Sequence, residues 1–416
     1  MTPRSLFAPD GTVLPCNDKS KLIHALENTV TAATDEISAD RQPGEECEIN
    51  EKIAVIDGMV FLQKLSKKAE SIVTVLDLSA TFNESLIKVT RQFDEIIVVF
   101  DTYRTESLKD RTRQTRRRGK DSVRYQIRDE TNIRHIPLSR FLSHSQTKAD
   151  LTQYMAKKIL EFNRDSSKLF ITSEAGLTRS NRDGYFFPDN NHEEADTLMI
   201  YLATTSAARH SIEAQMTFFS PDTDVFVLVI ANYDRWPKNT YISVASSVHK
   251  VETFWTAIGV NRARALPGLH AFTGTDNTGR FARISKSTWF KLFMEAEDEM
   301  IEALHTLCND RDIHEDLHLN LAKFVCAAYQ SKGLQFSSIP ELRWYLFCKH
   351  MTESERLPPT PGALRQHILR ARVQATIWGQ ATVPQQEQLD PLKNGYHRDT
   401  HDGNLKPITG RCSTSS

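Results

Sequence analysis

The stretch IAVIDG, residues 53–58, is a short apolar run that ends in Asp57 and a glycine. The apolar residues 53–56 predict a buried strand, and residues 58–66 predict the helix that follows it. The same order recurs in IIVVFD, where Asp101 follows the apolar run 96–100. Both runs therefore place an acidic side chain at the carboxyl end of a predicted strand.

Further apolar runs predict more strands, and helical patterns lie between them. Strands are predicted at residues 168–172, 217–220, 226–230 and 241–245. The run VFVLVI, which contains the third of these, is also compatible with a helix. Helices are predicted at residues 105–130, 148–163, 194–207 and 252–260. Because strands alternate with helices, we predict an α/β fold with a mainly parallel central sheet flanked by helices.

The length of 416 residues allows one large α/β domain and an appendage. We predict a polar and helical N-terminal extension at 1–50, the α/β domain at 51–295, a helical extension at 296–383 and a poorly ordered tail at 384–416. Because the tail is polar, we expect its removal to leave folding largely unchanged.

The composition excludes some classes of protein. The chain has 52 basic and 53 acidic residues, so its net charge of −1 does not point to nucleic acid, and only a local basic cluster could. The six cysteines are widely spread without metal-ligand spacing. With no signal peptide, they indicate a reducing, intracellular location, nuclear or cytoplasmic. No apolar run approaches the about 20 residues that span a bilayer, so no membrane association is predicted.

Acidic residues stand at the predicted strand ends and helix starts. They are Asp57, Asp101, Glu193, Glu194, Asp196, Asp222, Asp224 and Asp276. Parallel strands present such side chains at one edge of the sheet, where crowded carboxylates repel one another unless a cation neutralises them. Oxygen ligands suit Mg²⁺ or Mn²⁺. Two such ions about 4 Å apart would catalyse in-line displacement at phosphorus.

The order and context of these acids resemble the flap endonuclease (XPG-type) branch of the PIN-like 5′-nucleases. The matching motifs are AVIDG with Asp57, VFD with Asp101, EAD at 194–196, DTD at 222–224 and GTD at 274–276. The resemblance covers residues 51–295 and implies a PIN-like nuclease domain there. More closely, HEEADT, SPDTDV and FTGTDNTGRFARISKSTWFKLF are similar to uncharacterised PIN-like proteins of animal genomes, often found beside mobile elements.

The resemblance implies a divalent-metal-dependent nuclease, a phosphodiester hydrolase that acts on DNA or RNA with two Mg²⁺ or Mn²⁺ ions. The implied catalytic and metal-binding residues are Asp57, Asp101, Glu194 and Asp196 for one ion and Asp222, Asp224 and Asp276 for the other, with Asp196 near both. Residues two apart on a helix face away from each other, so Glu194 and Asp196 converge only in an irregular first turn. Glu193 is the alternative to Glu194.

A basic segment follows Asp101. Its predicted nucleic-acid-binding residues are Lys109, Arg113, Arg116, Arg117, Lys120 and Arg124, and Arg128 continues the stripe. On a helix they fall within about a third of the circumference, where they would neutralise successive phosphates. The position matches the helical arch of the resembled family, whereas the plainer interpretation is a solvated helix face. A second, weaker cluster contains Arg280, Arg283, Lys286 and Lys291.

A second hypothesis belongs to another class of protein. The chain could be a catalytically inactive PIN-like scaffold, derived from a mobile element, that binds nucleic acid or protein. Convergence of the carboxylates in one pocket would favour the nuclease, and their dispersal would favour the scaffold. His192, beside the acidic motif, is predicted to be a loop or cap residue rather than a ligand.

Overall fold

The computed structural model describes residues 4–37, 51–65, 72–102, 123–245, 247–309, 314–331, 333–350, 353–400 and 403–410. The chain forms two compact units. The sheet unit consists of Pro43–Glu252 and Ala381–Gln386, and the helical unit consists of Met1–Gln42, Thr253–Gln380 and Glu387–Ser416. These units differ from the four predicted parts, because the segment 253–295 and the N-terminal residues belong with the later helices.

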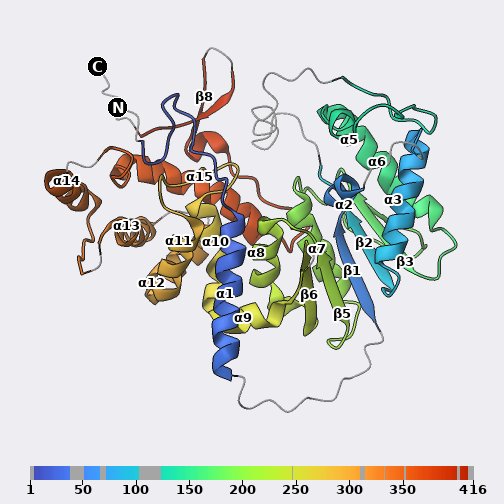
Figure 1. The fold of residues 1–416 in the computed structure, drawn as a ribbon, viewed down its shortest axis with the longest axis horizontal. Helices are drawn as coiled ribbons and strands as arrows, with labels where there is room; N and C mark the ends of the chain where they lie inside the picture. Colours follow the sequence, from blue (N-terminus) through green and yellow to red (C-terminus); the bar gives the residue numbers. More distant parts are fainter. Residues whose placement is uncertain are drawn as a thin grey trace. The chain divides into compact units, whose positions relative to one another are not determined.

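The sheet unit is built on a seven-stranded sheet of order β4-β3-β2-β1-β5-β6-β7 (Figure 1). Its strands are β1 (Lys52–Asp57), β2 (Glu95–Val99), β3 (Leu169–Glu174), β4 (Leu177–Ser180), β5 (Gln215–Phe219), β6 (Asn239–Val244) and β7 (Ser247–Lys250). The five inner strands are parallel, and β4 and β7 pair antiparallel at the two edges. The predicted mainly parallel sheet flanked by helices is therefore confirmed.

The register of the central strands decides where their acidic residues lie. Asp57 is level with Val99 of β2, and its neighbour Ile56 is level with Phe219 of β5. All three strands therefore end at one edge of the sheet, and their next residues along the chain emerge together.

Helices flank this sheet. They are α2 (Gly58–Lys64), α3 (Val75–Val89), α5 (Leu138–Phe141), α6 (Ser145–Phe162), α7 (Ala195–Ala207), α8 (Thr223–Ala231) and the 3-10 turn η1 (Tyr233–Arg235). One buried cluster joins the sheet to α3 and α6, and it contains Ile56 and Val98 of the sheet, Phe82 of α3 and Met155 of α6. Helix α7 packs against β1 and β2 and against α8 (Figure 1). A core this continuous holds the strand ends in fixed positions.

The helical unit contains α1 (Ser20–Ile37), α10 (Val260–Thr273), α11 (Lys286–Glu295), α12 (Asp298–Asn309), α13 (Glu315–Tyr329), α14 (Ile339–His350) and α15 (Pro361–Gly379). Helix α9 (Val251–Ile258) begins at the boundary between the units. Helices α10 and α12 cross closely at Gly268. A Cβ at this position would lie only 1.9 Å from the Leu304 carbonyl oxygen, so the crossing requires glycine. Trp289 and Phe324 pack with ring centroids 5.1 Å apart and their planes inclined at 42° in the aromatic core. Within residues 296–383 the helices are α12, α13, α14 and α15.

Two secondary-structure predictions are wrong. Residues 226–230 belong to α8 and not to a strand. Every side chain from 225 to 230 is fully buried, and a helix buried all round shows no polar periodicity by which to distinguish it from a strand. The predicted helix 105–130 is not continued at its described end, because residues 123–128 form neither helix nor strand.

The predicted poorly ordered tail is also not what the described residues show. It contains the 3-10 turn η2 (Pro391–Lys393) and the antiparallel strands β8 (Tyr396–Arg398) and β9 (Leu405–Pro407). The buried guanidinium of Arg370 donates to the carbonyl oxygens of Gly395 and Ile408, at 3.3 and 3.0 Å. A polar composition therefore concealed a segment that is fixed by long-range hydrogen bonds.

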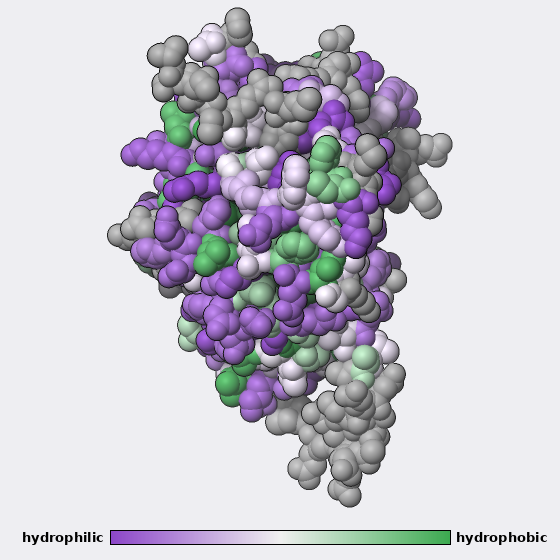
Figure 2. Space-filling model, turned by 90° about the vertical axis from the view of Figure 1, so that its left-hand side faces the viewer, coloured by the Kyte–Doolittle hydropathy of each residue, from purple (hydrophilic) through white to green (hydrophobic). Residues whose placement is uncertain are grey.

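The surface is largely polar on the face that Figure 2 draws, where hydrophobic residues lie scattered among hydrophilic ones. The more exposed large hydrophobic residues include Trp344 and Phe347 of α14. None of the helices in the described part of the chain is long and apolar enough to cross a membrane.

Candidate metal centre

Asp57 is the last residue of β1 and the N-cap of α2. Its Oδ1 accepts a hydrogen bond of 2.9 Å from the backbone N–H of Val60, which explains why the helix begins directly after it. The side chain is only 7% exposed. An apolar strand that leads straight into a capped helix thus buries a carboxylate at the edge of the sheet.

Burial raises the pKa of Asp57 to about 7. The negative charges of Asp101 and Asp222 raise this pKa further, while the hydrogen bond from Val60 opposes the shift. The carboxylates of three different strand ends are therefore close enough to repel one another. This is the condition in which a bound cation is most favourable.

Asp101 connects the end of β2 to the start of α7. Its Oδ1 accepts a hydrogen bond of 3.0 Å from the backbone N–H of Ala195, the first residue of that helix. The backbone N–H of Thr102 donates to the Glu193 carbonyl oxygen at 3.1 Å. A carboxylate at a helix N-terminus is stabilised by the unpaired N–H groups there.

The start of α7 carries two more buried acids. Glu194 is the N-cap residue in an extended conformation, and its side chain makes no capping hydrogen bond. Asp196 lies in the first turn, and the two side chains are 5% and 8% exposed. The backbone therefore changes from extended to helical between Glu194 and Asp196. This is the irregular first turn that would allow two acids at this spacing to serve one site. Glu193 is half-buried.

Asp222 and Asp224 occupy the start of α8, just beyond β5. Asp222 is the N-cap, and its Oδ1 accepts a 2.9 Å hydrogen bond from the backbone N–H of Asp224. The backbone N–H of Asp222 in turn donates to Oγ of Ser220 at 3.2 Å. The Asp222 cap fixes the point at which α8 begins.

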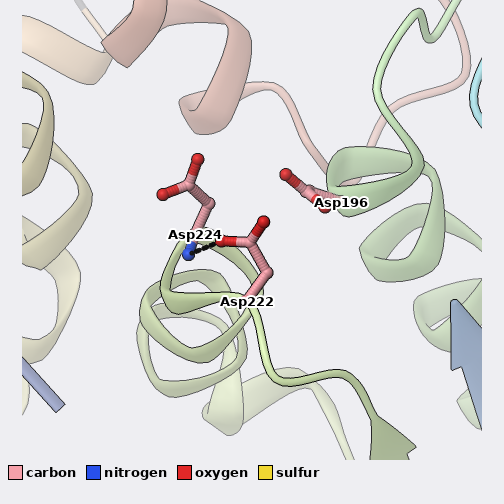
Figure 3. A group of neighbouring side chains, drawn as sticks. All are labelled: Asp196, Asp222 and Asp224. Atoms are coloured by element: carbon pink, nitrogen blue, oxygen red, sulfur yellow. Dashed lines mark hydrogen bonds between the residues drawn. The ribbon is translucent and has the colours of Figure 1, made fainter. Parts of the chain in front are cut away.

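Asp196, Asp222 and Asp224 converge. Each offers one carboxylate oxygen, and these oxygens all lie within 4.8 Å of one another. In Figure 3 the two carboxylates from the start of α8 and the one from the start of α7 line a common space. Among the described residues, these three side chains form a group whose spacing would allow them to hold a metal ion. Three hard oxygen donors fit Mg²⁺ or Mn²⁺.

Asp276 belongs to the helical unit, just after α10. It is exposed, and its Oδ1 lies 3.2 Å from Nζ of Lys19. Its role as a ligand therefore remains a prediction from the sequence pattern.

Most of the predicted nucleic-acid-binding residues, from Lys109 to Lys120, lie outside the described residues. Arg124 is described, with its side chain 61% exposed and Nη2 3.8 Å from Oδ2 of Asp150. In the second cluster, Lys286 is buried, and its Nζ donates to the His270 carbonyl oxygen at 2.7 Å and to Thr273 Oγ1 at 2.8 Å. The suggestion that Lys286 contacts nucleic acid is therefore wrong, because the ammonium is used to join α11 to α10.

His192 is the residue beside the site whose role the sequence understated. It is fully buried, with Nδ1 2.8 Å from Oγ1 of Thr197 and Nε2 2.8 Å from the carbonyl oxygen of Val383. Its ring stacks on Tyr201, with centroids 5.5 Å apart. Only its position immediately before the acidic motif could have indicated that it supports the start of α7.

No protein-family model matches the sequence, and no curated protein matches it. Among solved structures, the chain is similar to the zinc-bound 5′-exonuclease of T5, with a TM-score of 0.37, 12% identity, and coverage of 65% of this chain and 84% of that one. The chain is also similar to a bacteriophage T5 flap endonuclease with DNA and metal ions, with a TM-score of 0.37, 11% identity and the same coverage. For the catalytic core of Rad2 with a DNA substrate, the TM-score is 0.33 and the identity 14%, and the match covers 79% of this chain and 96% of that one.

Proposed function

We propose that this chain is a divalent-metal-dependent nuclease that hydrolyses phosphodiester bonds in DNA or RNA. The observation that carries the proposal is the convergence of Asp196, Asp222 and Asp224, whose carboxylate oxygens lie within 4.8 Å of one another. Asp57 and Asp101 lie at the same sheet edge, and their charges interact. Such a concentration of buried negative charge is costly without a cation.

Two groups of ligands are proposed for two ions. Asp57, Asp101, Glu194 and Asp196 would hold one ion, and Asp222 and Asp224 would hold the other with Asp196 near both. Asp276 is added to the second group on its sequence pattern alone. When bound, the ions would supply a nucleophile from water at neutral pH and stabilise the charge that develops on phosphorus.

The protein's own contribution is to hold these carboxylates in place. Asp57, Asp101 and Asp222 each have Oδ1 fixed by a backbone N–H, at 2.9, 3.0 and 2.9 Å. These bonds orient three mutually repelling groups before any ion arrives. Preorganisation of this kind reduces the reorganisation that metal binding requires.

The proposed substrate contacts come from the basic segment. Lys109, Arg113, Arg116, Arg117, Lys120 and Arg124 would bind successive phosphates and direct one of them to the carboxylates. Neutralising phosphates in this way releases counterions from the nucleic acid, so the binding should weaken as the salt concentration rises.

The test is a cleavage assay with flap, single-stranded and duplex substrates of both nucleic acids. We expect cleavage with Mg²⁺ or Mn²⁺ that stops with chelator and is lost in Asp224→Asn. Asp165→Asn is the matched control, because Asp165 is an exposed aspartate of the same unit, in the turn after α6. Absence of cleavage by the parent chain with either metal on every substrate would reject the nuclease and leave the binding scaffold.

A further inference from the structure

Residues Ala381–Gln386, which we call the strap, leave the helical unit after α15 and belong to the sheet unit. They make hydrogen bonds to Asp189, Asn191 and His192, in the segment that leads into α7. The strap therefore contacts the segment that precedes Glu194 and Asp196.

Asn191 is bound to the strap at three points. Its backbone N–H donates to the Pro384 carbonyl oxygen at 3.0 Å. Its side-chain Nδ2 donates to the Gln386 carbonyl oxygen at 2.8 Å, and its Oδ1 accepts from the Gln386 N–H at 2.7 Å. The side-chain amide thus pairs with both the N–H and the C=O of Gln386, as a residue of a neighbouring strand would.

His192 carries the connection into the helix. One ring nitrogen contacts Val383 of the strap and the other contacts Thr197 of the first turn, as described above. Thr197 is fully buried, and its Oγ1 lies 3.2 Å from the Glu194 carbonyl oxygen as well as 2.8 Å from the His192 ring. A continuous series of polar contacts therefore runs from the strap to the residues on either side of Asp196.

The other side of this segment is held as well. The Nδ2 of Asn190 donates to the Gly176 carbonyl oxygen, in the turn between β3 and β4, at 3.2 Å. Residues 190–192 are consequently fixed between that turn and the strap. The segment has little freedom to move away from Asp222 and Asp224.

We propose that the strap is a positioning element for the metal centre, with Asn191 and His192 as positioning residues that hold the start of α7 against carboxylate repulsion. The proposal rests on the proposed metal site. Partners that orient metal ligands in this way typically contribute about 10- to 100-fold to metal affinity.

The experiment is a calorimetric titration of the full chain with Mn²⁺, combined with kcat at saturating Mn²⁺ and the melting temperature. We expect Asn191→Ala and His192→Phe to raise the Mn²⁺ Kd at least about tenfold. Saturating Mn²⁺ should restore most of kcat. His192→Gln, which keeps a donor for the Val383 carbonyl oxygen, should recover part of the affinity.

The matched control is Asn181→Ala. Asn181 also makes several hydrogen bonds to backbone, accepting from Phe170 N–H at 2.8 Å and donating to the Asn163 and Lys168 carbonyl oxygens. Phe170 is near the start of β3, whereas the carboxylates lie at the carboxyl ends of the parallel strands. In this control the melting temperature should fall, while the Mn²⁺ Kd should stay equal to that of the parent.

An unchanged Mn²⁺ Kd in folded Asn191→Ala and His192→Phe overturns the strap proposal, even if the parent cleaves nucleic acid. Where Asn191→Ala does not fold, Asn191→Asp retains the acceptor for the Gln386 N–H and is judged by the same criterion. A parent that binds Mn²⁺ without cleaving contradicts the nuclease, while the Kd values still decide about the strap. A parent that binds no Mn²⁺ overturns both.

Discussion

Asp101 accepts a hydrogen bond of 3.0 Å from the backbone N–H of Ala195, which lies 94 positions later in the chain. This bond joins the end of β2 to the start of α7, and it places a strand-end carboxylate beside the acids of a helix start. The same carboxylate is thus a helix cap and a proposed metal ligand, and the two roles can be separated by substitution.

Asp101→Asn should keep the cap and lose the ligand. The amide oxygen can still accept from Ala195, so the melting temperature should stay near that of the parent, whereas Mn²⁺ affinity and turnover should fall strongly. Asp101→Ala should additionally lose stability, by about 1 kcal/mol, because the cap is gone. Thermal unfolding and Mn²⁺ titration of both variants test this. Equal turnover in Asp101→Asn and parent would show that Asp101 is only a cap.

The pKa of Asp57 predicts how the stability of the metal-free protein depends on pH. Because this pKa is about 7 in the folded chain, against about 3.9 for an ordinary Asp, the folded state binds more protons than the unfolded state between these values. The free energy of unfolding should therefore fall as pH rises from about 4 to 7. Asp57→Asn should remove this contribution, which is on the order of a few kcal/mol.

Urea unfolding in chelator at pH 5 and pH 8 measures the effect of Asp57. The parent should lose more stability between the two pH values than Asp57→Asn, and saturating Mg²⁺ should reduce the difference. A parent and variant with the same pH dependence would mean that Asp57 is ionised as an ordinary carboxylate.

The basic segment should determine nucleic-acid binding but not metal binding. Replacing Arg113, Arg116 and Arg117 by Gln should weaken binding and make it less dependent on salt, by about one unit of slope for each phosphate that is no longer neutralised. Mn²⁺ affinity should stay unchanged. The matched control replaces three exposed arginines of the sheet unit, Arg91, Arg134 and Arg140. If both triple variants bind alike, the segment is a solvated surface.

Asp276 and Lys19 offer a test of the seventh proposed ligand. Lys19→Met removes their 3.2 Å ion pair, and Asp276→Asn removes the carboxylate as well. If Asp276 is a ligand, turnover falls in Asp276→Asn and is retained in Lys19→Met. If it is only an ion-pair partner, both variants change the melting temperature slightly and cleave like the parent.

Removal of the C-terminal residues should destabilise the fold, in contrast to the expectation from their polar composition. Ending it after Val383 removes the hairpin of β8 and β9 and the Gln386 contacts with Asn191, so the melting temperature should fall by several degrees or more. A chain that ends after Gly410 keeps every described residue and serves as the control. Equal melting curves for the two shortened chains would restore the prediction of a dispensable tail.

The sequence by itself determined the parallel sheet and the edge at which its acids gather. Both follow from local signals, because a run such as 53–56 predicts a buried strand and parallel strands end at a common edge. Asp57, Asp101 and Asp222 directly follow or closely succeed such strands, so their grouping could be predicted without knowing any contact between them.

Only the tertiary structure decided how the remaining groups are arranged. The run 225–230 has no polar periodicity, so its helical conformation depended on the Asp222 cap and on burial from all sides. The contact of His192 with Val383 spans 191 positions, and a hydrogen bond to a backbone carbonyl leaves no pattern in the sequence of the strap. Periodicity records which face of an element is buried, whereas the partner on that face is set by the packing of the whole chain.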